Sequence, residues 1–175
     1  MPESRVRRAK ILREAEGLLE LCLPRQALGA LARLGDPTGF DGRAMYLWGE
    51  ALRLMGRHEE ALVPLSHAAN ADPEDIHVWL SLGWCYKRTG RIDLAIESIE
   101  NALTSDPEEP LLHYNLACYS SLAGDRERAM AHLRQALTLD ADYKRLIAAE
   151  SDFDPIREDP EFRTLTGGTE IGNRG

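Results

Sequence analysis

The stretch WLSLGWCYKRTG, residues 79–90, has two related copies elsewhere in this chain, and this repetition decides the fold. MYLWGEALRLMG, residues 45–56, stands 34 residues before it, and HYNLACYSSLAG, residues 113–124, stands 34 residues after it. A fixed period of this length is typical of repeat architectures, in which each unit buries its apolar face against its neighbours. The sequence therefore predicts a stack of similar units.

Each unit has the pattern of two helices joined by a tight turn. In the middle repeat, the first predicted helix has one packing face, made of Trp79, Leu82, Gly83 and Tyr86. Gly90 follows at the place where a left-handed helix terminus needs a residue without a β carbon. The second predicted helix has a similar face, made of Ala95, Ile99 and Ala102. The unit ends at Pro107, which cannot continue a helix.

Small residues recur at the predicted helix contact. Gly83 is expected to face Ala95 within its hairpin, and both positions stay small in every repeat. The other two pairs are Gly49 with Ala61 and Ala117 with Ala129. Only small side chains allow two helix backbones to approach closely, so these pairs predict tightly packed hairpins.

At these residues the chain resembles the tetratricopeptide repeat family, whose pattern is W-x2-L-G-x2-Y, then A-x3-F, then P. The middle repeat matches it with Ile99 in place of Phe, and the flanking repeats match more loosely. The resemblance implies an all-α fold, a right-handed superhelical α-solenoid of antiparallel helix hairpins. It also implies a protein-interaction module without catalytic activity.

We predict a single repeat domain over residues 1–165. Its parts are a degenerate repeat (8–41), three clear repeats (42–75, 76–109 and 110–143), a capping segment (144–165) and a disordered tail (166–175). In the degenerate repeat Cys22 replaces the turn glycine and Glu14 takes an apolar position. In the capping segment Phe153, Ile156 and Phe162 are expected to cover the last repeat.

Pro64 conflicts with the helix predicted around it, because a proline ring inside a helix normally costs about 3 kcal/mol. We expect a kink on the outer, solvent-facing side of the helix there.

Charge and cysteine content restrict the class of protein. The net charge of −8 argues against nucleic-acid binding, which needs clustered Lys and Arg. The three cysteines, Cys22, Cys85 and Cys118, form no CxxC pair, and free thiols fit a reducing compartment. No signal peptide or membrane-spanning run is expected. These features predict a cytoplasmic location.

No catalytic motif stands out in the sequence. It has no Gly-rich phosphate loop, no GxSxG and no HExxH. The residues His58-Glu59-Glu60 could suggest a metal site, but the two glutamates are better explained as favourable charges at a helix N-terminus. We therefore expect no enzyme activity, no cofactor and no metal.

The resemblance implies a partner-binding groove on the first helix of each repeat. A second stripe of side chains lies beside the packing stripe and would line this groove: Arg43, Tyr46, Glu50, Arg53, His77, Leu80, Trp84, Lys87, Arg88, Tyr114, Asn115 and Cys118. Trp84 is the main expected anchor, because Trp79 and Tyr86 already fill the packing stripe. Four cations are opposed mainly by Glu50, so the groove is predicted to be basic and aromatic. Its ligand would be a peptide or protein with acidic residues around apolar anchors.

One subfamily of these repeats clamps the C-terminal carboxylate of heat-shock chaperones with matched Lys, Asn and Arg residues. The matching positions here are Tyr46, Glu50, Ser81, Leu111 and Asn115, so no such clamp is expected. Two alternatives stay open beside a general binding module, a dedicated bacterial secretion chaperone and a self-assembling scaffold. The charged capping segment disfavours end-to-end stacking, so a monomer is favoured.

Overall fold

A computed structural model describes residues 2–167 of the chain as helices joined by short turns, with no β-strand in that range. The predicted all-α class is confirmed. The chain divides into two compact units, Met1–Asn101 and Ala102–Gly175. None of the helices in the described range has both the length and the apolar character needed to cross a bilayer.

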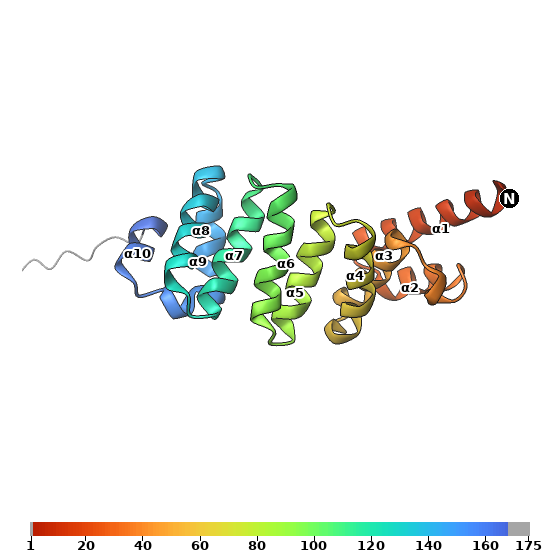
Figure 1. Ribbon diagram of the computed structural model, residues 1–175, viewed down its shortest axis with the longest axis horizontal. Helices are drawn as coiled ribbons and strands as arrows, with labels where there is room; N and C mark the ends of the chain where they lie inside the picture. Colours follow the sequence, from red (N-terminus) through yellow and green to blue (C-terminus); the bar gives the residue numbers. More distant parts are fainter. Residues whose placement is uncertain (1, 168–175) are drawn as a thin grey trace, which may run out of the picture. The chain divides into compact units, whose positions relative to one another are not determined.

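The first unit is a series of helix hairpins that follow the repeat boundaries (Figure 1). Its elements are α1 (Pro2–Glu20), α2 (Pro24–Ala32), the 3-10 helix η1 (Pro37–Gly39), α3 (Gly42–Leu54), α4 (His58–Ala71), α5 (Ile76–Arg88) and the greater part of α6 (Ile92–Ser105). Within this unit α1 packs on α2, α3 on α4, and α4 on α5. Aspartates start two of the helices, because the Asp41 carboxylate accepts a hydrogen bond from Ala44 N and the Asp75 carboxylate accepts one from His77 N.

The turns between paired helices have one backbone design. Gly56 and Gly90 have φ values of 75° and 76°, as the left-handed helix terminus requires. In the α1–α2 hairpin the same place is taken by Cys22 with φ of 56°, the only non-glycine residue with positive φ in the described chain. Leu23 N donates to Leu18 O at 2.8 Å, just as Arg91 N donates to Tyr86 O in the middle repeat. The degenerate first hairpin therefore keeps the turn even though it lacks the glycine.

The predicted close approach of the paired helices is present, although the contacting atoms differ from those expected. A β carbon added to Gly83 would lie 2.9 Å from Ile99 Cδ1 and 3.4 Å from the Ala95 carbonyl oxygen. At Gly49 it would lie 2.6 Å from Leu65 Cγ. Each glycine thus makes room for a large buried side chain of the partner helix, and not only for the small residue predicted to face it.

The first helix, α1, starts at Pro2, which is N-terminal to residue 8, where the degenerate repeat is predicted to begin. Pro24 opens α2 at its first turn, as expected. Glu14, which interrupts the apolar pattern, lies on the surface and forms a bidentate ion pair with Arg33, with both oxygens 2.8 Å from Nη1. This pair ties α1 to the segment that follows α2.

The predicted solvent-facing position of Pro64 is wrong. Pro64 is buried, and α4 continues through it from His58 to Ala71. The equivalent residues of the neighbouring repeats in this unit, Ala30 and Ser98, are also buried, so this position belongs to the packing face of the second helix. The gain from burying the ring offsets the lost hydrogen bond to the Glu60 carbonyl.

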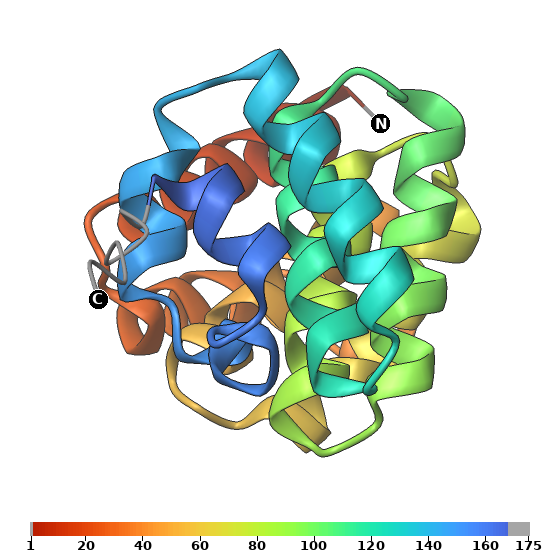
Figure 2. The same ribbon diagram turned by 90° about the vertical axis from the view of Figure 1, so that its left-hand side faces the viewer.

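The second unit contains the last repeat and the segment after it (Figure 2). Its elements after α6 are α7 (Pro110–Leu122), α8 (Arg126–Leu139), α9 (Tyr143–Ala149), the 3-10 helix η2 (Ser151–Ile156) and α10 (Pro160–Thr166). η2 packs on α7, while α9 and α10 pack on α8. Phe153, Ile156 and Phe162 are buried there. The predicted disordered tail lies outside the described residues, except for Thr166 and Gly167, which close α10.

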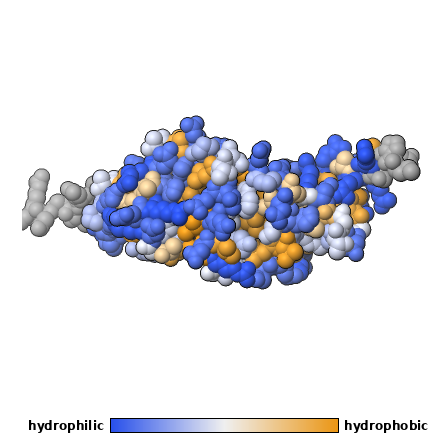
Figure 3. All heavy atoms as spheres, viewed as in Figure 1, coloured by the Kyte–Doolittle hydropathy of each residue, from blue (hydrophilic) through white to orange (hydrophobic). Residues whose placement is uncertain are grey.

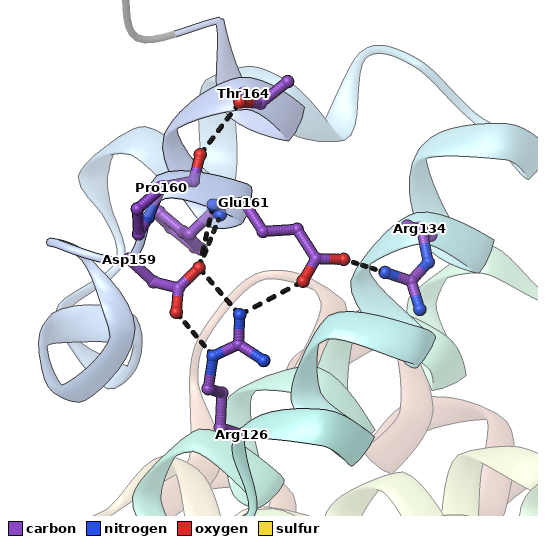
Figure 4. Close-up of polar contacts among 7 residues, drawn as sticks. Arg126, Arg134, Asp159, Pro160, Glu161 and Thr164 are labelled. Atoms are coloured by element: carbon purple, nitrogen blue, oxygen red, sulfur yellow. Dashed lines mark hydrogen bonds and ion pairs between the residues drawn. The ribbon is translucent and has the colours of Figure 1, made fainter.

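Charged groups fasten α10 to α8, as Figure 4 shows. Arg126 Nε donates to Asp159 Oδ2 at 2.5 Å, and Arg126 Nη2 donates to Glu161 Oε2 at 3.1 Å. Arg134 forms a further pair with Glu161. Asp159 also caps α10 by accepting a hydrogen bond from Glu161 N at 2.8 Å. These contacts hold the pKa of Asp159 at about 2, with the Arg126 guanidinium as the main cause.

Candidate partner-binding surface

The predicted groove residues of the first unit lie on two neighbouring helices, α3 and α5. We call them the α3–α5 surface and define it by Arg43, Tyr46, Glu50, Arg53, His77, Leu80, Trp84, Lys87 and Arg88. α3 and α5 contact each other, and the Ser81 hydroxyl donates to Glu50 Oε2 at 2.8 Å across this contact. The repeat alignment therefore brings these two sets of residues together.

One end of the α3–α5 surface opens into a cavity of about 760 Å³ between α1, α3, α4 and α5. Four of the predicted residues line it, Arg43, Tyr46, Glu50 and His77. This volume is in the usual range for ligand sites in proteins. We call this space the acidic cavity because of its carboxylates, which are Glu16, Glu20, Glu50, Asp72 and Asp75.

The charge of this end differs from the basic groove predicted from the sequence. Five carboxylates line the acidic cavity against a single guanidinium, that of Arg43. Arg43 Nη2 lies 2.6 Å from Glu16 Oε2, so α1 supplies a partner for it. Arg53 forms a bidentate pair with Glu50, with Nε 2.9 Å from Oε2. The two arginines counted as free cations are therefore matched by carboxylates.

Tyr46 is a partly buried residue in the lining of the acidic cavity. Burial raises the pKa of its hydroxyl to about 12, and the negative charges of Glu50 and Asp75 act in the same direction. The phenol therefore stays protonated at neutral pH and can donate a hydrogen bond. Apolar side chains line the same cavity, namely Leu19, Leu47, Leu54 and Val78.

The other end of the α3–α5 surface carries Trp84, Lys87 and Arg88, which lie on the last two turns of α5. Trp84 is 39% exposed, and Lys87 Nζ lies 5.2 Å from the centre of its ring, within cation–π range. The pKa of His58 is lowered, first by burial and then by the positive charges of Arg88 and Arg53. Both guanidinium groups therefore lie near the start of α4, and Arg88 is exposed.

The predicted groove residues of the second unit are mostly covered. Cys118 is only 2% exposed, so the prediction that it contacts a partner is wrong. Tyr114 is half-buried under the capping segment, with its ring 5.3 Å from Tyr143 and 6.0 Å from Phe153. Its hydroxyl donates to Glu150 Oε2 at 3.3 Å. Asn115 is partly buried, and its amide donates to the Leu111 carbonyl of the same helix.

The capping segment is the physical reason for this correction. The repeat alignment treats α7 as equivalent to α3 and α5, but η2 lies on α7 and takes the place that a partner would need. The sequence predicted the capping residues and the groove residues separately. It did not show that the capping segment would pack on the groove residues of α7.

Several residues that line the acidic cavity were not predicted from the sequence, among them Glu16, Leu19, Glu20, Asp72 and Asp75. Glu16, Leu19 and Glu20 belong to the degenerate repeat, and the two aspartates flank the α4–α5 turn. A signal for the first three was available, because the degenerate repeat also contributes a first helix.

The surface in the view of Figure 3 is mainly hydrophilic and is interrupted by smaller hydrophobic patches. Within residues 2–167, no group of three or more His, Cys, Asp or Glu side chains is arranged to hold a metal ion. Burial raises the pKa of the Cys85 thiol to about 12, so this cysteine is a packing residue and an unreactive thiol at neutral pH.

These features define the chain as a helical-repeat protein, built from stacked antiparallel hairpins with a ligand-sized surface on their first helices. Two family models, both described as tetratricopeptide repeat, match residues 52–117 and 111–143, which together make up more than half of the chain. The protein belongs to the tetratricopeptide repeat family. The comparison with curated proteins returned no match.

Several solved structures share this fold at low sequence identity. MamA aligns with a TM-score of 0.67 and 22% identity, over 77% of this chain and 79% of the MamA chain. PilF from Pseudomonas aeruginosa aligns with a TM-score of 0.74 and 16% identity, over 97% and 80% of the two chains. YrrB, described as a TPR protein with an unusual peptide-binding site, aligns with a TM-score of 0.68 and 20% identity, over 77% and 70%.

Proposed function

We propose that this chain is a non-catalytic protein-interaction module that holds a peptide segment of a partner protein on the α3–α5 surface. The family makes protein or peptide partners the general expectation. The single observation that carries the proposal is Trp84, a large aromatic residue that is exposed while the equivalent positions Glu50 and Cys118 are partly or fully buried.

The chemistry around Trp84 favours a partner with acidic residues beside an apolar anchor. An exposed indole offers rigid apolar contact area, which is typical of binding hot spots. Lys87 lies over its ring, and Arg88 is exposed one residue further along α5. A carboxylate next to the apolar anchor of the partner would meet these cations. YrrB, which shares the fold, has a peptide-binding site, and this agrees with a peptide ligand.

The test compares two exposed apolar residues of the first unit. A partner is captured with the full-length chain, identified, purified, and titrated against wild type, Trp84→Ala and Leu94→Ala. Leu94 is the matched control, since it is 40% exposed and lies on α6, away from the α3–α5 surface. Trp84→Ala should weaken binding by about 30-fold or more, which corresponds to about 2 kcal/mol. Leu94→Ala should change it by less than about twofold.

A charge reversal at Arg88 adds a kinetic test. Arg88→Glu should slow association and weaken its dependence on salt, because exposed charges steer the encounter and are screened within about 8–10 Å. If Trp84→Ala and Leu94→Ala bind the partner equally well, and Arg88→Glu associates at the wild-type rate, the partner uses another surface and the proposal fails.

We also propose that the module acts as a monomer. The capping segment buries Phe153 and Phe162, and Arg126 pairs with Asp159 at the start of α10, so charged groups lie at this end of the chain and disfavour end-to-end stacking. Light scattering of the full-length chain should give the mass of one chain over a wide concentration range. A mass that rises with concentration would favour the self-assembling scaffold instead. Cytoplasmic location and a role in secretion stay predictions.

A further inference from the structure

The acidic cavity has a ligand chemistry opposite to that of the Trp84 end. Glu20 and Asp72 lie at its rim and are exposed, whereas Glu16 and Glu50 are occupied by Arg43 and Arg53. The cavity therefore has more carboxylates than it has cations to neutralise them. A ligand that brings positive charge would complete this balance.

Part of the wall of the acidic cavity is apolar, and this feature restricts the class of ligand. Leu19, Leu47 and Val78 are each less than a tenth exposed, and Leu54 adds a more open apolar contact. Lys and Arg side chains combine an aliphatic stem with a cationic head. The stem suits the leucine and valine side chains, while the head can reach the carboxylates at the rim.

Tyr46 gives the cavity a fixed polar group. Its hydroxyl is protonated at neutral pH, because burial and the nearby carboxylates raise its pKa to about 12. It can donate to a peptide carbonyl of a bound segment, and backbone contacts of this kind favour a peptide over a free metal cation.

From this geometry we propose that the acidic cavity binds a Lys or Arg side chain, together with a neighbouring apolar residue, from a basic segment of a partner protein. The inference rests on the proposed interaction function and adds a second specificity to the same surface. Together the two ends of the α3–α5 surface would select a segment with cationic residues for the acidic cavity and acidic residues for Trp84.

The experiment uses three matched short peptides as probes, each with two leucines and two charged positions. The charged positions hold lysine, glutamine or glutamate. Each peptide is titrated into the full-length chain with methyl-labelled Leu and Val, and NMR shifts are recorded at low and at moderate salt. The lysine peptide should shift the methyl signals of Leu19, Leu47 and Val78. The glutamine peptide should bind at least about threefold more weakly, and the glutamate peptide should give no shift there.

Matched variants separate a local effect from a general effect of charge. Glu20→Gln with Asp72→Asn removes two carboxylates of the cavity and should weaken the lysine peptide by about threefold to tenfold. Glu74→Gln with Glu108→Gln removes two charges outside the cavity lining, at equivalent loop positions, and should change the affinity by less than about twofold. All four residues are surface carboxylates, and unchanged melting curves confirm that the variants fold.

Three results would overturn the inference. The three peptides could shift the cavity methyl groups equally, the control pair could weaken binding as much as the cavity pair, or the lysine peptide could shift only signals elsewhere. If the chain self-associates and the cavity pair abolishes this association, a second copy is the occupant and the partner-protein proposal fails. In any of these cases, the proposed function would still be supported if Trp84→Ala abolishes binding of the captured partner.

Discussion

Replacing Gly49 with alanine should destabilise the protein, although the same change inside a helix is normally favourable. The added β carbon would lie 2.6 Å from Leu65 Cγ, 2.8 Å from Leu65 Cδ2 and 3.3 Å from Leu65 N. Leu65 is completely buried, so moving its side chain away from the new methyl group would disturb its packing in the core. The change tests the central packing claim of the fold, namely that paired helices approach closely enough to require a glycine.

The expected magnitude follows from two opposing effects. Overpacking a filled core costs about 1–3 kcal/mol, while Gly to Ala in a helix interior gains about 1 kcal/mol. The net result should be a loss of up to about 2 kcal/mol in the free energy of unfolding. The third repeat has Ala117 at the equivalent position, so a hairpin of this kind can accommodate a methyl group there. This limits the expected loss of stability.

The assay is urea unfolding of the full-length chain followed by far-UV circular dichroism. Gly17→Ala is the matched control, because Gly17 lies inside α1 and an added β carbon meets nothing within 4 Å. This variant should gain about 0.5–1 kcal/mol. A Leu65→Ala background supplies a double-mutant cycle, in which Gly49→Ala should lose most of its cost. Equal stabilisation by Gly49→Ala and Gly17→Ala would refute the packing argument.

Three further predictions concern the turns, the thiols and the capping segment. Cys22→Gly should raise the free energy of unfolding by about 1 kcal/mol, because Cys22 has φ of 56°, a left-handed conformation that favours glycine. Cys22→Ala should have little effect, and equal stability of the two variants would contradict this prediction. Thiol titration at neutral pH should find one fast-reacting cysteine, which Cys22→Ala removes, whereas fast reaction of buried Cys85 would show that its packing is wrong. Because the folded pKa of Asp159, about 2, is below its ordinary value of 3.8, its stabilising effect is complete above pH 3.8 and is lost as the pH falls toward 2. Asp159→Asn should therefore flatten the acid unfolding curve in that window, and an unchanged curve would exclude the Arg126 contact as its cause.

Local signals explain why the hairpins could be predicted. Helical spacing of apolar residues and glycines with positive φ, such as Gly90, depend only on the neighbouring chain. The side of the helix on which Pro64 lies depends on the adjoining helices, so the sequence of its own helix could not settle it. The equivalent positions hold the small residues Ala30 and Ser98, and this indicates that the position faces the adjoining helices.

The arrangement of the α3–α5 surface could be predicted from the repeats, but its ion pairs could be predicted only in part. Alignment of the repeats placed Tyr46, Glu50 and Trp84 on neighbouring helices, because equivalent residues of stacked hairpins occupy equivalent places. The ion pair between Glu16 and Arg43 joins residues of different repeats, and its formation depends on the reach of two long side chains. Coverage of Tyr114 by η2 is likewise a tertiary event that no local pattern reports.

The most direct test of the interaction function is hydrogen–deuterium exchange of the full-length chain with and without its captured partner. Binding on the α3–α5 surface predicts slower exchange in residues 42–54 and 76–88, with little change in residues 126–139. The Trp84→Ala variant at the same partner concentration should lose the protection in residues 76–88. Protection confined to residues outside α3 and α5 would contradict the proposal.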